Sequence, residues 1–214
     1  MRGVLPALLL FLAMFPLGGC YETTVMVLSA EEAEPVPGLE GTYLPRFNHF
    51  SGPQDKPDSE RLTLKRSGAG NDYSATSEAE EVGTLRFHKL KDDVYLAQVD
   101  SGPLPLDPQS YDVGFVRVTG RELVFLMPVP PGVPLPKDPL PRETAATAFT
   151  RWLDPSMTER LHTESEKIAA TFKVTLSDRE GGSLLDGGKA AVSKFLLSHR
   201  TWSFVPFAGY VREK

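Results

Sequence analysis

The amino-acid sequence predicts an α+β fold. An antiparallel β-meander of about seven strands over residues 39–127 precedes a small helix–hairpin–helix part over residues 142–214. Three observations predict this architecture. Short β-prone segments alternate with turn residues in the first stretch. Half of the residues at 128–141 are proline, which favours an extended linker. Beyond this linker, the hydrophobic period lengthens to that of a helix.

Residues 1–19 have the three parts of a secretory signal peptide. Arg2 supplies a positive charge, residues 4–15 are almost wholly apolar, and a cleavage region rich in small residues follows at 16–19. The apolar run is about a dozen residues long, whereas a transmembrane helix needs roughly 20. We therefore expect this segment to direct export and to be removed.

The end of this segment, Leu17-Gly18-Gly19-Cys20, resembles the lipobox of bacterial lipoproteins. The resemblance implies cleavage between Gly19 and Cys20, a diacylglycerol on the Cys20 thiol and acylation, as with palmitate, of the new amino group. Two or three acyl chains anchor a protein stably in a membrane. Tyr21 stands where an Asp would favour the inner membrane, so the resemblance implies an outer membrane facing the periplasm. A plain signal peptide with an incidental cysteine is the alternative.

The composition indicates a mildly acidic globular protein. The chain carries 23 Lys and Arg against 28 Asp and Glu, a net charge of −5, so nothing in its electrostatics favours nucleic acid. Cys20 is the single cysteine, so packing alone must supply stability. Residues 20–38 are expected to be the acylated N-terminus and a tether, although residues 23–28 are β-prone and Ser29 and Glu32 have capping-box spacing.

Alternating apolar residues predict the strands of the meander, and turn residues separate them. The segments are 38–44, 61–65, 73–76, 84–89, 94–99, 111–118 and 122–127. Their order resembles the lipocalin-like sheets of small bacterial envelope lipoproteins. Lipocalins carry Gly-x-Trp near the first strand, whereas Gly41-Thr42-Tyr43 has tyrosine. The sequence is therefore compatible with both a closed barrel and a curved, partly open sheet.

The C-terminal part follows the Pro-rich linker at 128–141. Helices are expected at 142–153, 156–172 and 186–199, and a hairpin pairs 173–177 with 183–185. The tail at 201–210 holds four aromatic residues and is therefore expected to dock on the body.

No residue pattern predicts catalysis, a metal site or a cofactor. His49, His88, His162 and His199 lack metal-ligand spacing, and G-x-S-x-G is absent. His88 is expected to face solvent, and His199 is expected to interact with the dipole at a helix C-terminus. Glycine-rich stretches at 68–72 and 186–189 are interpreted as turns or caps.

These features favour a non-enzymatic, membrane-anchored envelope protein that binds a protein partner or a small apolar ligand. One alternative is a hydrolase, favoured by a pocket that brings His49, His88 or His162 together with a carboxylate and a serine. Another is an envelope assembly factor that contacts partners through its aromatic tail.

The lipobox makes a direct prediction about Cys20. Wild-type protein should fractionate with membranes and show the added mass of lipid, whereas the Cys20→Ser variant should lose both. Membrane fractionation and intact-mass measurement check this. A wild-type protein without lipid, together with a variant that stays equally membrane-bound, would contradict it.

Overall fold

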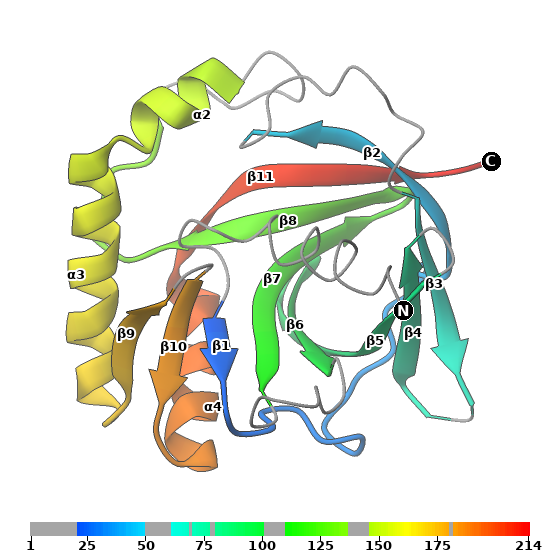
Figure 1. The fold of residues 1–214 in the computed structure, drawn as a ribbon, viewed down its shortest axis with the longest axis horizontal. Helices are drawn as coiled ribbons and strands as arrows, with labels where there is room; N and C mark the ends of the chain where they lie inside the picture. Colours follow the sequence, from blue (N-terminus) through cyan, green and yellow to red (C-terminus); the bar gives the residue numbers. More distant parts are fainter. Residues whose placement is uncertain are drawn as a thin grey trace, which may run out of the picture.

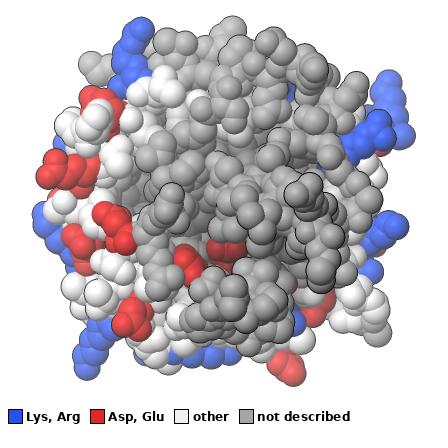
Figure 2. All heavy atoms as spheres, in the orientation of Figure 1, with Lys and Arg blue, Asp and Glu red and all other residues white. Residues whose placement is uncertain are grey.

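The computed structural model describes residues 21–49, 61–68, 70–77, 80–100, 110–136, 146–179 and 182–214. These residues form a mostly antiparallel β structure with short helices at its side (Figure 1). Acidic and basic side chains are interspersed on the part of the surface that Figure 2 describes. The strands are β1 (Tyr21–Thr23), β2 (Gly41–Asn48), β3 (Leu62–Ser67), β4 (Asp72–Ser77), β5 (Glu80–Lys91), β6 (Val94–Asp100), β7 (Tyr111–Thr119), β8 (Glu122–Val129), β9 (Thr175–Arg179), β10 (Gly182–Asp186) and β11 (Ser203–Arg212). The helices are α2 (Ala146–Trp152), α3 (Pro155–Thr171) and α4 (Lys189–Ser198), with a 3₁₀ turn η1 at His199–Thr201.

Eight of the strands close into a barrel. Strands β2 to β8 follow one another as a meander, β11 lies between β2 and β8, and pairing of β6 with β7 closes the ring. The predicted meander of about seven strands is thus confirmed, and the partly open alternative is wrong. The class α+β is also corrected to a mostly β fold, because the C-terminal part contributes strands to the same sheet instead of forming a separate layer.

The sheet forks at β7. One edge of β7 pairs with β6, and the other edge pairs with β8 from Phe115 to Thr119. Over Tyr111 to Val113, β1 pairs with β7 antiparallel, and β10 continues from β1 in parallel. The hairpin of β9 and β10 therefore extends the barrel sheet sideways, beside α3 (Figure 1).

Alternate residues of the strands serve two different cores. Leu64, Phe87 and Val116 belong to a cluster that fills the barrel interior. Val113 and Phe115 belong to a second cluster on the outer face, where α4 packs with Phe195 and Leu196. Both faces of β7 are therefore buried, as expected of a strand shared between two packed layers. A third cluster joins α2 and α3 to β8 and β11 and includes Met127, Phe149, Leu161 and Phe207.

The aromatic tail docks by forming strand β11. Its pairing shifts register between Pro206 and Ala208 and again between Gly209 and Tyr210, and both irregularities hide the period-two pattern from the sequence. A Cβ on Gly209 would lie 2.3 Å from the Phe47 ring, so only glycine fits there without displacing that ring. Trp202, Phe207 and Tyr210 are buried, so the tail presents none of these rings to a partner.

The proline-rich segment is only partly a linker. Pro128 belongs to β8 and pairs with Phe204 of β11, contrary to the expectation that these prolines stay out of the sheet. A proline fits because pairing of β8 with β7 ends at Leu126, which leaves β11 as the paired neighbour within the described residues. Residues 137–141 lie outside the described part.

The N-terminal segment predicted as a tether packs on the barrel wall, apart from Cys20, which lies outside the described residues. Tyr21–Thr23 is strand β1, and Val27, Leu28 and Val36 are buried. The buried Gln98 side chain fixes this segment, because its Oε1 accepts hydrogen bonds from the Val27 and Leu28 backbone N–H groups at 2.8 Å each. These two N–H groups would otherwise be buried without partners.

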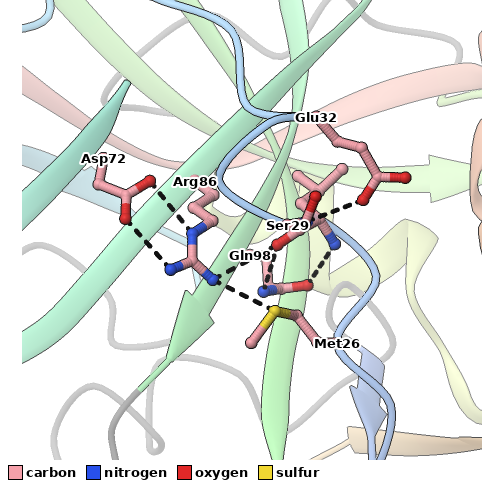
Figure 3. A network of polar contacts seen from close by, with 7 residues as sticks. Met26, Ser29, Glu32, Asp72, Arg86 and Gln98 are labelled. Carbon is pink, nitrogen blue, oxygen red and sulfur yellow. Dashed lines mark hydrogen bonds and ion pairs between the residues drawn. The ribbon is translucent and has the colours of Figure 1, made fainter. Parts of the chain in front are cut away.

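A polar network extends this attachment (Figure 3). Arg86 donates two parallel hydrogen bonds of 3.1 Å to Asp72 and reaches the Leu28 carbonyl at 3.4 Å. Glu32 accepts from the Ser29 backbone N–H, as the predicted capping spacing requires, and also contacts Lys189. The Ser29 backbone N–H, followed by Lys189, lowers the pKa of Glu32 to about 2.

The interior of the second core holds a buried imidazole, His199. Its Nδ1 lies 3.1 Å from the carbonyl oxygens of Phe195 and Leu196, and its Nε2 lies 3.1 Å from the Tyr21 hydroxyl. The two carbonyl oxygens only accept, so Nδ1 carries a proton, and in the neutral ring Nε2 accepts from the Tyr21 hydroxyl. Burial lowers the pKa of His199 to about 3. The prediction that His199 interacts with the helix dipole as a charged group is therefore wrong, because its ring is buried and uncharged.

This burial predicts a loss of stability in acid. In the unfolded chain, His199 binds a proton near the ordinary histidine pKa of about 6.5. In the folded protein, it binds a proton only near pH 3. The free energy of unfolding should therefore fall as pH decreases through this range, by up to about 1.4 kcal/mol per pH unit from this group. Urea unfolding of wild-type and His199→Gln proteins between these pH values measures the difference.

Asp112 has a raised pKa in the folded state, so it increases the free energy of unfolding as pH falls, opposite to His199. Both proteins contain Asp112, so the difference between them reports on His199. The matched control is His88→Gln, since His88 is partly exposed. It should keep the wild-type slope. An undiminished acid slope in His199→Gln would refute this assignment.

Candidate ligand-binding cleft

The barrel interior has little free space. The cavity between Leu62, Phe87, Val99, Val116 and neighbouring side chains is about 30 Å³. Ligand pockets commonly measure roughly 300–1,000 Å³, whereas one water occupies about 30 Å³ of liquid. Large side chains such as Tyr43 and Phe87 fill the space that a wider barrel would leave open.

One carboxyl group lines this small cavity. Asp112 lies on β7 directly opposite Glu22 of β1. Burial, and then the neighbouring Glu22 charge, raise the pKa of Asp112 to about 6. The group therefore carries a proton for part of the range in which surface carboxyls are ionised. The cavity beside it is too small for an organic ligand.

A much larger cavity, of about 670 Å³, lies between α3 and the fork of the sheet. We call it the α3 cleft. Residues of β1, β8, β9, β10 and α3 line it, so it forms where β8 separates from β1 (Figure 1). Its apolar lining includes Met127, Leu153, Leu161 and Leu176.

Local sequence fixes how α3 borders the cleft. Asp154 caps the helix by accepting a 2.8 Å hydrogen bond from the Met157 backbone N–H, which also lowers the pKa of Asp154. Pro155 follows at the first helical turn, where its missing N–H costs nothing. With its start fixed, α3 turns Leu161 and Ser165 toward the cleft. The predicted helix at 156–172 is thereby confirmed within a residue of α3.

His162 is the central polar residue of the cleft. Its Nε2 lies 3.2 Å from Glu166 Oε1 on the next turn of α3, and its Nδ1 lies 3.1 Å from Asp178 Oδ1 on β9. Carboxylates only accept hydrogen bonds, so the ring can donate to both of them at once only when both of its nitrogens carry a proton. In that form His162 ties the helix to the hairpin across one wall of the cleft.

Two buried serines also line the cleft. Ser165 lies on α3, and Ser183 lies on β10 directly opposite Asp178. Their residues are 8% and 9% exposed. Neither hydroxyl forms a side-chain hydrogen bond to another described residue. Both hydroxyls therefore keep hydrogen-bonding capacity that a ligand in the cleft could use.

The other histidines lie elsewhere. His49 is buried between the rings of Phe47 and Phe149, at centroid distances of 4.9 and 5.3 Å, and burial lowers its pKa. The Nδ1 atom of His88 lies 3.0 Å from Glu34 Oε1 near the surface. His199 belongs to the core. Among the four histidines, His162 alone lines the cleft.

Part of this site could be recognised from the sequence. The spacing of His162 and Glu166 places them on one helix face. The approach of Asp178 and Ser183 depends on the packing of α3 against the β9–β10 hairpin, which no local pattern encodes. Within the described residues, no group of three or more metal-ligating side chains is arranged to hold a metal ion.

The predicted processing site, Gly19 and Cys20, lies outside the described residues, which begin at Tyr21. Tyr21 starts β1 and lines the α3 cleft. None of the helices in the described ranges combines the length and hydrophobicity needed to cross a membrane.

Comparisons with protein-family models, curated proteins and solved structures found no match to this chain.

Proposed function

We propose that this chain is a lipid-anchored envelope protein that binds a small, largely apolar ligand in the α3 cleft without transforming it. The observation that supports this proposal is the cleft itself, whose volume of about 670 Å³ falls within the range of ligand sites. A filled barrel interior of about 30 Å³ makes the lipocalin-like mode of binding, inside the barrel, the weaker alternative.

The lining supports a ligand with an apolar body. Met127, Leu153, Leu161 and Leu176 present hydrocarbon surface to the cleft. Each methylene group that a ligand buries against such surface contributes about 0.8 kcal/mol. The polar residues lie on α3 and the β9–β10 hairpin, where they would orient one end of the ligand.

The proposed anchor at Cys20 would place the cleft close to a membrane. Consecutive Cα atoms are about 3.8 Å apart, and Tyr21 already belongs to the sheet. A lipid on Cys20 would therefore join the folded body without a spacer, at the residue next to one that lines the cleft. An outer-membrane position facing the periplasm remains part of the proposal through the lipobox resemblance.

Filling the cleft with a large side chain should weaken ligand binding. Ser165→Trp and Thr158→Trp introduce an indole ring from two positions on its lining. We expect each to weaken the binding of octanol, used as an apolar probe, by at least about tenfold in calorimetry, or about 1.4 kcal/mol.

The matched control is Lys167→Trp, because Lys167 lies on α3 with an exposed side chain and does not line the cleft. Thr158 is only partly buried, whereas Ser165 is buried, so the Thr158 variant should fold even where Ser165→Trp does not. Octanol binding that is unchanged in the folded Thr158→Trp variant would place the binding site elsewhere.

A hydrolase is the second candidate function, because His162, Asp178, Ser165 and Ser183 all line the same cleft. In a serine hydrolase, one imidazole nitrogen faces the serine while a carboxylate holds the other. Here, carboxylates face both nitrogens of His162. Glu166 would have to release Nε2 before the ring could accept a proton from a serine. This arrangement favours binding over catalysis.

The two functions are separated by an esterase assay with p-nitrophenyl butyrate. We expect the wild-type chain and the His162→Gln variant to show the same rate as buffer. Hydrolysis by the wild type that falls in His162→Gln and in either Ser165→Ala or Ser183→Ala would establish the hydrolase instead.

The assembly-factor alternative relied on contacts through the aromatic tail. Trp202, Phe207 and Tyr210 of the tail are buried, and Phe204 is partly exposed. A partner would therefore have to contact Phe204 or residues outside the tail.

A further inference from the structure

We infer that the ligand of the α3 cleft carries an organic cation, such as an alkylammonium group, at its polar end, and that His162 occupies the cation position when the cleft is empty. This inference rests on the proposed function and specifies the chemistry of its ligand.

The lining of the α3 cleft is acidic. Glu159 and Asp178 line it, and Glu166 contacts His162 at its edge. None of the described residues that line it is Lys or Arg. A ligand anion would be repelled here, whereas a cation would be attracted.

His162 shows where the cation would bind. As an imidazolium, it donates to Glu166 and Asp178 at the same time. A neutral imidazole has a single N–H and can donate to one of them only. Loss of the proton therefore leaves one carboxylate without a donor. An ammonium group, with three N–H donors, can take that place.

The two serines supply the remaining partners. Ser165 and Ser183 are more than nine-tenths buried, line the cleft and form no side-chain hydrogen bonds within the described residues. Their oxygens can accept from the N–H groups of the cation that do not reach a carboxylate. The apolar lining formed by Met127, Leu161 and Leu176 accommodates the hydrocarbon part.

His162 should compete with the ligand cation for the same carboxylates. The acidic residues available to either are Glu159 and Glu166 from α3 and Asp178 from β9. The residues of β8 and β10 that line the cleft, namely Met127, Pro128, Gly182 and Ser183, carry no charged side chain. Replacing His162 with an uncharged residue should therefore strengthen the binding of the cation.

Calorimetry on the purified full chain with octylammonium, octanol and octanoate tests the inference. Octylammonium should bind at least about tenfold more tightly than octanol, and octanoate should bind most weakly. The Glu159→Gln/Asp178→Asn double variant should lose this preference and retain octanol binding. The matched control is Asp186→Asn, because Asp186 is an exposed acid of β10 that does not line the cleft; it should behave as wild type.

Repeating the titration with His162→Gln tests His162 itself, because glutamine carries no positive charge. Octylammonium should bind this variant more tightly than the wild type, whereas octanol should bind both equally. Unchanged octylammonium affinity in His162→Gln would overturn the role of His162. Equal or tighter binding of octanol or octanoate would overturn the cation and leave the proposed function standing. Absence of binding by all three probes would overturn the proposed function.

Discussion

The pairing of β7 with three different strands is the constraint on which this structure depends. Its edge toward β6 closes the barrel, while its other edge is shared by β8 and β1. Because β8 pairs with β7 only from Phe115 onward, the first residues of β7 are free to hold β1 and, through it, the β9–β10 hairpin. The α3 cleft lies in the angle between these two branches. A barrel closed along its full length would leave no such space.

The two ends of the chain complete this arrangement. Strand β11 returns from the C-terminus to close the barrel between β2 and β8, and β1 at the N-terminus connects the barrel to the hairpin. Tyr21 joins the two through its contact with His199, which is stacked on Trp202 with ring centroids 3.8 Å apart. The helices α3 and α4 are therefore held against the sheet by residues from both ends of the sequence.

The sequence predicted those parts of the fold in which local pattern and tertiary structure agree. Period-two alternation identified β2 to β8, and the hydrophobic spacing over 156–172 identified α3. It missed the strand character of β11, since Pro206 and Gly209 interrupt its alternation at two bulges. The closure of the barrel was equally hidden, because no local pattern specifies which strand edges meet. In the candidate site, the Glu166–His162 pair follows from helix spacing, whereas Asp178 reaches His162 only through tertiary packing.

A filled barrel and a peripheral cleft are consistent with the single cysteine of this chain. No intrachain disulfide can form, so burial of apolar surface must supply the stability. A hollow interior would give up contacts such as those of Phe87 and Leu64, and each large side chain lost from a core costs about 2–5 kcal/mol. A cleft at the fork avoids this loss, because the barrel packs independently of whatever occupies the cleft. It also allows polar groups such as His162 to remain partly solvated, whereas His199, buried in the core, is held neutral. The same residue type therefore stabilises the fold in one place and is available for charge recognition in the other.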